Sequence, residues 1–194
     1  MTQNLNYRPE IDGLRAIAVL SVLIYHADIV LLGWQIAPGG FIGVDVFFVI
    51  SGYLISRIIF SEINETDKFD LRNFFERRVR RLLPALLLVI AVTLPYAWTS
   101  LLPFGQIEYA QSIVATLLFL SNFFFYEVTT SYAAQNSLLK PLLHTWSLGV
   151  EEQFYIFFSL FVILLSKLKR PNFLITLFFF TFCSFLFAQL LVGK

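Results

Sequence analysis

Residues 82–102 read LLPALLLVIAVTLPYAWTSLL, a stretch without one charged side chain. Residues 109–126 and 171–193 are also free of Asp, Glu, Lys and Arg. Apolar runs of about 18 or more residues without charge are typical of membrane-spanning helices. Because hydrocarbon offers the backbone no hydrogen-bond partners, such a segment must satisfy its own polar groups as a helix. The sequence therefore predicts an all-α integral membrane protein.

The composition supports the same class of protein. Of the 194 residues, 58% are hydrophobic and 14% are charged, whereas a soluble domain carries about 25% charged residues. A mean hydropathy of +0.75 leaves too few polar side chains to cover a water-soluble globule. A soluble enzyme, a secreted disulfide scaffold and a disordered tail are thereby excluded. The net charge of +1 identifies no partner. We expect contact with the lipid bilayer, and neither a nucleic-acid partner nor a bound metal.

The apolar pattern predicts one domain, residues 1–194, in which about six transmembrane helices form a bundle. We expect these helices at Leu14–Leu32, Phe41–Phe60, Leu82–Leu102, Ile107–Tyr126, Leu148–Ser166 and Asn172–Val192. The turn-forming residues 38–40 separate the first two segments, and residues 103–105 separate the third from the fourth. The first segment contains His26 and Asp28, so we expect it to be retained and not removed as a signal peptide.

The segment Ser61–Arg81 is rich in charges of both signs, with an excess of basic residues. Asp70 is placed to cap a helix that begins at Leu71 and has an apolar face. We expect an amphipathic helix at the membrane interface that leads into the third span. By the positive-inside tendency, its arginines together with Arg8 and Arg15 place the N-terminus in the cytoplasm. The protein is thus predicted to be a multi-pass protein of the plasma membrane.

Ionisable side chains inside spans are costly, and each is therefore a candidate site residue. Arg15 and His26 stand three helical turns apart on one face of the first segment. Asp45 lies near the start of the second segment. Glu152 lies near the start of the fifth, beside a stripe of polar residues that repeats every four positions: Ser147, Glu151, Tyr155 and Ser159.

His26 and Asp45 are expected at similar depths, about 9 Å and about 6 Å from the outer ends of their segments. A carboxylate at that depth could orient the imidazole through a hydrogen bond. The histidine could then act as a general base on a hydroxyl group. The alternative is a packing histidine that a backbone carbonyl satisfies, and the sequence leaves both interpretations open.

Four arginines stand just before the third span: Arg77, Arg78, Arg80 and Arg81. Their guanidinium groups match the geometry of phosphate oxygens, which favours a docking site for a phosphorylated cytosolic ligand. The alternative is a topology signal with no further role. Replacing Arg78 and Arg81 by Lys separates the two hypotheses, because the charge stays and the two-point geometry is lost.

Topology poses a conflict. Counting crossings from a cytoplasmic N-terminus puts residues 144–152 inside and the basic residues 167–170 outside, against the positive-inside tendency. A re-entrant segment within residues 82–147, or a further crossing in Glu127–Leu143, removes the conflict. We therefore expect Glu152 on the same outer side as His26 and Asp45. Single cysteines at Ser137 and Lys167, probed with an impermeant thiol reagent, test this expectation.

Taken in order, the motifs resemble those of the membrane-bound acyltransferase-3 family. They are YRPEIDGLRA at residues 7–16, His26, GGFIGVDVFFVISGY at residues 39–53, the run Phe75–Pro84, and HTWSLGVEEQFY at residues 144–155. The resemblance implies transfer of an acyl group, usually acetyl, from cytoplasmic acyl-CoA to a hydroxyl of an extracytoplasmic carbohydrate. Such acceptors include lipopolysaccharide O-antigen, peptidoglycan and exopolysaccharide, and the location it implies is the bacterial inner membrane.

By motif position, His26 corresponds to the family's essential histidine. Arg78 and Arg81 correspond to its paired arginines, which are thought to hold the acyl-CoA co-substrate, here acetyl-CoA. Three further motif residues are implied to line the path: Arg15, Asp45 and Glu152. Family members have about ten helices, so the chain is expected to be the N-terminal part of a larger acyltransferase domain, truncated at its C-terminus.

Two other interpretations stay open. In the first, a transporter or proton-relay protein, His26, Asp45 and Glu152 pass protons without covalent chemistry. The second is an inactive membrane fragment. The arginine cluster distinguishes the first from an acyltransferase, because a proton path needs no phosphate dock. The sequence determines neither the oligomeric state, nor the acceptor hydroxyl, nor the length of the acyl chain.

Overall fold

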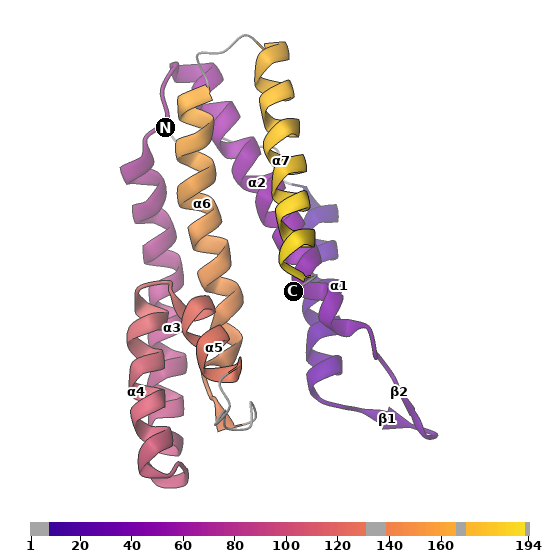
Figure 1. Ribbon diagram of the computed structural model, residues 1–194, viewed down its shortest axis with the longest axis vertical. Coiled ribbons are helices and arrows are strands. Elements are labelled where there is room, and N and C mark those ends of the chain that lie inside the picture. Colours follow the sequence, from indigo (N-terminus) through magenta and orange to yellow (C-terminus); the bar gives the residue numbers. More distant parts are fainter. Residues whose placement is uncertain (1–7, 131–138, 166–169, 193–194) are drawn as a thin grey trace. The chain divides into compact units, whose positions relative to one another are not determined.

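The computed structural model describes residues 8–130, 139–165 and 170–192, and helices dominate these ranges (Figure 1). The chain forms two compact units, Met1–Tyr155 and Ile156–Lys194. In order, the elements are α1 (Pro9–His26), β1 (Val30–Leu31), β2 (Trp34–Gln35), η1 (Gly40–Ile42), α2 (Gly43–Thr66), α3 (Leu71–Ser100), α4 (Pro103–Leu117), α5 (Ser121–Thr130), η3 (Leu143–Thr145), α6 (Trp146–Leu165) and α7 (Arg170–Val192). The predicted all-α membrane class is confirmed, and the prediction of a single domain stays a prediction.

Within the described ranges, four helical segments are long and apolar enough to cross a membrane: Gly40–Thr66, Leu71–Ser100, Leu143–Leu165 and Asn172–Leu190. The expected count of six is therefore not confirmed. The helix at the first expected span, α1, begins before Leu14, carries Glu10, Asp12 and Arg15 in its first turns, and ends early at His26. The fourth expected span, Ile107–Tyr126, is divided between two short helices.

α1 and α2 pack backbone against backbone at two glycines. A Cβ added to Gly40 would stand 2.2 Å from the carbonyl oxygen of Ser21, and one added to Gly43 would stand 2.5 Å from that of Ala18. Small residues allow this approach between membrane helices. The two contacts also fix the register of the antiparallel pair, because each step along α2 moves one step back along α1.

Gly40→Ala should lower the stability of the α1–α2 pair by about 1–3 kcal/mol, because the new methyl group forces a backbone shift. Gly13→Ala is the matched control, since its Cβ would meet no described atom within 4 Å. An exposed helical Gly→Ala change is itself neutral or favourable. Thermal denaturation in detergent measures both variants, and equal melting temperatures would contradict the expected contact.

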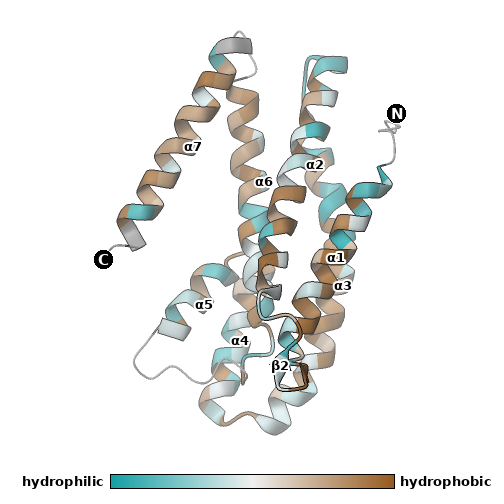
Figure 2. Ribbon diagram, turned by 90° about the vertical axis from the view of Figure 1, so that its right-hand side faces the viewer, coloured by the Kyte–Doolittle hydropathy of each residue, from teal (hydrophilic) through white to brown (hydrophobic). Residues whose placement is uncertain are grey.

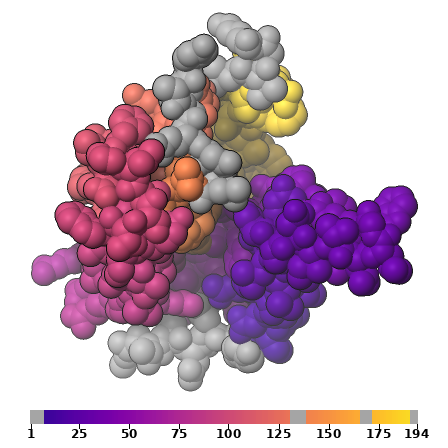
Figure 3. All heavy atoms as spheres, turned by 90° about the horizontal axis from the view of Figure 1, so that it is seen from below, coloured from indigo at the N-terminus to yellow at the C-terminus, as the bar shows by residue number. Residues whose placement is uncertain are grey.

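The link between α1 and α2 contains an antiparallel hairpin, with Val30 opposite Gln35 and Leu31 opposite Trp34. Gly33 supplies the turn with a φ of 84°, a conformation that favours glycine. The segment that carries the hairpin projects from the rest of α1 and α2 (Figure 3). Helical geometry was expected to continue to Leu32. Instead α1 ends where this link begins, which leaves His26 at a helix end.

α3 begins as predicted, with the backbone N–H of Asn73 donating to Oδ1 of Asp70 at 3.0 Å. It then continues without interruption through Pro84 and Pro95 to Ser100. The charged segment was expected to form an amphipathic helix that begins at Leu71 and leads into the third span, and α3 has this continuous course. Its acidic first part belongs to the end of α2, and its arginines occupy the first turns of α3 itself.

α4 and α5 form a short helical hairpin beside α3 (Figure 1). With 15 residues, α4 extends about 22 Å, less than the roughly 30 Å of a hydrocarbon core. The chain reverses at Phe119, whose φ is 56°. The re-entrant segment and the outer placement of Glu152 stay predictions. Ser137 and Lys167, proposed for cysteine labelling, lie outside the described residues.

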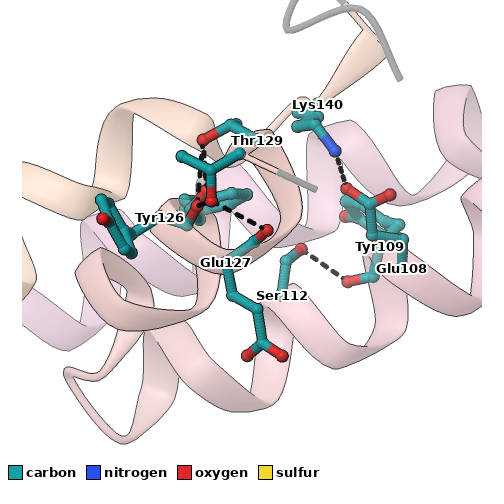
Figure 4. A network of polar contacts seen from close by, with 9 residues as sticks. Glu108, Tyr109, Ser112, Tyr126, Glu127, Thr129 and Lys140 are labelled. Carbon is teal, nitrogen blue, oxygen red and sulfur yellow. Dashed lines mark hydrogen bonds and ion pairs between the residues drawn. The ribbon is translucent and has the colours of Figure 1, made fainter. Parts of the chain in front are cut away.

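A buried ion pair fastens this hairpin to the residues that precede η3 (Figure 4). The ammonium group of Lys140 donates to Oε1 of Glu108, and their side chains are only 3% and 11% exposed. An apolar cluster packs nearby: Ala97, Leu101, Tyr109, Phe125 and Leu142. The Thr93 and Tyr109 hydroxyls also bond at 2.8 Å, which ties α4 to α3.

The second unit consists of the end of α6 and all of α7. α7 is coloured as hydrophobic along most of its length (Figure 2), and most of its described large apolar side chains are exposed. Phe161 packs edge-on against Phe180, with ring centroids 5.1 Å apart. Such an apolar surface is suited to contact with lipid. Of the basic residues expected in the link, Lys167 and Lys169 lie outside the described residues.

Candidate functional site

Four helices of the first unit enclose a pocket of about 350 Å³ that contains four arginines. We call it the arginine pocket. Arg15 comes from α1, Arg77, Arg78 and Arg81 come from α3, and the remaining lining residues are Ser51, Leu54, Ile55, Ile58, Phe74, Leu82, Glu151 and Tyr155. Its volume lies within the range of about 300–1,000 Å³ that is usual for small-molecule sites. Four guanidinium groups face one lining carboxylate, so the pocket suits an anionic ligand.

Helical periodicity places these arginines together. Phe74, Arg78 and Arg81 recur at spacings of four and three, which aligns them on one face of α3. Arg80 falls on another face, where its Nη2 donates to Oε1 of Glu76 at 2.6 Å and its side chain is 78% exposed. Of the four arginines of the cluster, Arg77, Arg78 and Arg81 therefore line the pocket, and Arg80 does not.

Glu152 binds one of the pocket arginines. Nε and Nη2 of Arg78 donate to Oε1 of Glu152 at 3.1 and 2.9 Å. The carboxylate side chain is only 5% exposed, and the guanidinium also lies 3.7 Å from the centroid of the Tyr155 ring. Burying two charges is costly unless they pair well, so this geometry fixes Arg78 in one orientation. Its remaining nitrogen, Nη1, makes no hydrogen bond within the part of the chain that the structure describes.

Glu151 has a different environment from its neighbour Glu152. Its Oε1 accepts hydrogen bonds from the hydroxyls of Ser51 on α2 and Tyr155 one turn further along α6. The Ser51 bond joins α2 to α6, whereas the Tyr155 bond lies within α6. Adjacent residues of one helix point about 100° apart, which explains why only one of the two carboxylates lines the pocket.

A second pocket, of about 330 Å³, lies between α3 and the start of α6. We call it the histidine pocket. Its α3 side is apolar, and its other side carries polar groups; the lining residues are Leu82, Ala85, Leu86, Val89, His144, Thr145, Ser147, Leu148 and Glu151. Leu82 and Glu151 also line the arginine pocket, so the two pockets are neighbours with a common boundary.

His26 does not meet Asp45 as expected. Nδ1 of His26 donates instead to the backbone oxygen of Val22 at 2.9 Å, which leaves Nε2 as an acceptor. No hydrogen bond or ion pair joins His26 to Asp45 among the described residues. The register set by Gly40 places Asp45 level with residues 16–20 of α1, at least one turn short of His26. The equal-depth argument was wrong because α1 ends at His26.

The structure brings together Arg78 and Arg81, the pair implied to hold the co-substrate, and Arg15, which was implied to line the path. It adds Glu152 through its bond to Arg78, and it leaves His26 and Asp45 outside this cluster. Sequence reasoning did not assign roles to three residues that line the two pockets: Ser51, His144 and Glu151. The four-residue repeat of polar groups along α6 was a signal for Glu151, and Ser51 carried none.

Comparison with known proteins gives a consistent result. The family described as Acyltransferase domain, acyltransferase-3, matches residues 8–193. Similar relatives include the O-acetyltransferase OatA of Staphylococcus aureus strains NCTC 8325 and COL, each 41% identical over 179 residues. The aligned region covers 92% of this chain and 28% of each relative, so the chain spans less than a third of their length. No solved structure matches the chain significantly. Because the family match extends along nearly the whole chain, the protein belongs to the acyltransferase-3 family.

Proposed function

We propose that this chain provides the donor-binding part of a membrane O-acyltransferase. The donor is cytoplasmic acyl-CoA, in the first instance acetyl-CoA, and the acceptor is a hydroxyl of an extracytoplasmic carbohydrate such as peptidoglycan, O-antigen or exopolysaccharide. The name of the OatA relatives supports acetyl transfer to oxygen. The bacterial inner membrane, with the N-terminus in the cytoplasm, is the location that gives the arginine pocket access to acyl-CoA.

One observation carries this proposal: arginines from α1 and α3 line one pocket. A topology signal needs only positive charge on the cytoplasmic side, and scattered exposed arginines would provide it. Instead, Arg78 is held in a fixed orientation by Glu152 and Tyr155. Fixed guanidinium groups bind phosphate oxygens through paired hydrogen bonds. The phosphates of coenzyme A are ligands of this kind.

Arg81→Lys should weaken the binding of acetyl-CoA about tenfold, because lysine keeps the charge and loses the planar donor pair. Arg80→Lys is the matched control, since Arg80 lies on the exposed face of α3 and pairs with Glu76. Equilibrium binding of radiolabelled acetyl-CoA to the full chain in lipid nanodiscs measures both variants. Equal affinities for the two variants and the unsubstituted chain would reject the docking role.

His26, Asp45 and Glu152 enter the proposal with distinct roles. The free Nε2 of His26 supports its assignment as the general base for the acceptor hydroxyl. Asp45 is proposed to line the path of the acyl group. Glu152 is proposed as a positioning residue, because its contact is with Arg78.

His26→Gln should abolish acyl transfer and leave acetyl-CoA affinity unchanged, because the residue stands apart from the arginine pocket. Transfer is measured with acetyl-CoA and isolated peptidoglycan or lipopolysaccharide, in membranes that contain either the unsubstituted protein or the His26→Gln variant. Retained transfer would exclude His26 as the base. A protein that binds no acetyl-CoA but conducts protons in vesicles would favour the proton-relay interpretation, and one that does neither would favour an inactive fragment.

A further inference from the structure

The two pockets lie next to each other along α3, because Leu82 and Glu151 line both. Arg78 and Arg81 mark one end, and the histidine pocket follows from Leu82 to Val89. Along α6 the sequence runs in the opposite direction. Glu151 lies at the boundary between the two pockets, and His144, which comes earlier in the sequence, lies about 10 Å from it by helical rise. Both helices therefore indicate the same sequence of environments, from cationic to apolar. The stretch from Arg78 to Val89 covers about 16 Å of α3.

The chemistry of acyl-CoA changes in the same order. Its nucleotide end carries the phosphates, and a long flexible arm with two amide groups leads from it to the thioester and the acyl chain. The phosphates match the arginine pocket, as the proposed function requires. The arm has no charge and needs an apolar channel with few polar partners, and the α3 wall offers one: Leu82, Ala85, Leu86 and Val89.

The boundary residue Glu151 fits this arrangement. A carboxylate beside phosphate groups would repel them, so its presence in an arginine-rich pocket needs a reason. Among the described residues, Ser51 and Tyr155 both donate to its Oε1, and a carboxylate has further lone pairs to offer. Amide N–H groups of a passing arm are suitable donors for them. The boundary thus suits an uncharged amide and not a second phosphate.

Resting on the proposed function, we propose that the histidine pocket is the subsite for the pantetheine arm of the donor. The ligand class is a neutral, amide-containing thioester arm. Glu151 accepts from its amide groups, and the Leu82–Val89 face of α3 contacts its apolar atoms. The binding of one donor molecule is then divided between two pockets, a cationic one for the nucleotide and an apolar one for the arm.

If donor binding is divided in this way, a side chain that fills the histidine pocket should block binding of the arm and leave binding of the nucleotide end unchanged. Ala85→Phe should lower acetyl-CoA affinity at least about tenfold by excluding the arm, and should leave the affinity for adenosine 3′,5′-bisphosphate unchanged. Ala91→Phe is the matched control on the opposite face of α3, and should alter neither affinity. Arg81→Lys should weaken the binding of both ligands. Binding to the full chain in nanodiscs provides all of these measurements.

A second measurement avoids a bulky substitution. Ser147 lines the histidine pocket, and Ser147→Cys is nearly isosteric. With Cys183, the single native cysteine, replaced by Ser, acetyl-CoA should slow alkylation of the new thiol at least tenfold, whereas adenosine 3′,5′-bisphosphate should not. The control is Thr99→Cys, near the end of α3, whose labelling neither ligand should change.

The outcomes separate the two proposals. If the unsubstituted chain binds neither ligand, the proposed function is wrong, and the proposed subsite is then wrong as well. If it binds both, but Ala85→Phe binds acetyl-CoA normally or Ser147→Cys is not protected, only the subsite is wrong. If Ala85→Phe loses both ligands, the alkylation result decides, because that variant does not depend on filling the pocket.

Discussion

Lys140→Met should lower the free energy of unfolding by about 3–5 kcal/mol, the usual cost of leaving one member of a buried ion pair without its partner. Glu108 would remain in the interior, only 11% exposed and flanked by the apolar cluster around Tyr109. The hairpin of α4 and α5 would then lose its main polar attachment to the segment before η3. Equilibrium unfolding in mixed micelles, followed by tryptophan fluorescence, measures the change.

The double variant Lys140→Met with Glu108→Leu is the control for this effect. Replacing both charges by apolar side chains removes the unpaired group, so stability should return to the original value or exceed it. A double variant as unstable as the single one would show that packing, and not the unpaired charge, causes the loss. A single variant within 1 kcal/mol of the original would contradict the buried pair itself.

Arg78→Met should have two separable effects. Glu152, whose side chain is 5% exposed, would be left as an unpaired buried carboxylate, at a cost of about 3–5 kcal/mol. The arginine pocket would also lose its best-oriented guanidinium group, so acetyl-CoA binding should fall below detection. Thermal stability and radioligand binding are measured on the same preparation.

The double variant Arg78→Met with Glu152→Leu separates these effects. Stability should be restored, because no buried charge remains unpaired, whereas acetyl-CoA binding should stay lost. If binding returned together with stability, Arg78 would be a structural residue only, and Arg77 with Arg81 would have to provide the dock. Glu152→Gln alone should give an intermediate loss, since one oxygen can still accept from Arg78.

Periodicity within one helix was sufficient to predict the arginine stripe. Arg78 and Arg81 lie on one face of α3 because of their spacing, and the cap at Asp70 follows from local chemistry. Neither inference requires knowledge of which helices are neighbours. The hydropathy of Leu82–Leu102 likewise predicted most of a span correctly.

Predictions that depended on helix ends or on distant contacts were less successful. The expected meeting of His26 and Asp45 assumed that α1 continues to Leu32, and a short hairpin ends it six residues earlier. The pairs Arg78–Glu152 and Lys140–Glu108 connect residues that are 74 and 32 positions apart. Many partners are possible at such separations, and only the fold selects among them.

The shortness of α4 and α5 also determines the order in which the chain can be built into a membrane. Neither helix is long enough to be inserted as an independent span, since about 20 apolar residues are needed. Ser121 finds its acceptor, the carbonyl of Thr145, only after η3 has been synthesised. Glu108 can likewise pair with Lys140 only after residue 140 has been synthesised. We therefore expect α3 and α6 to enter the bilayer first during biosynthesis. The hairpin of α4 and α5 should then pack between them in a second stage of assembly.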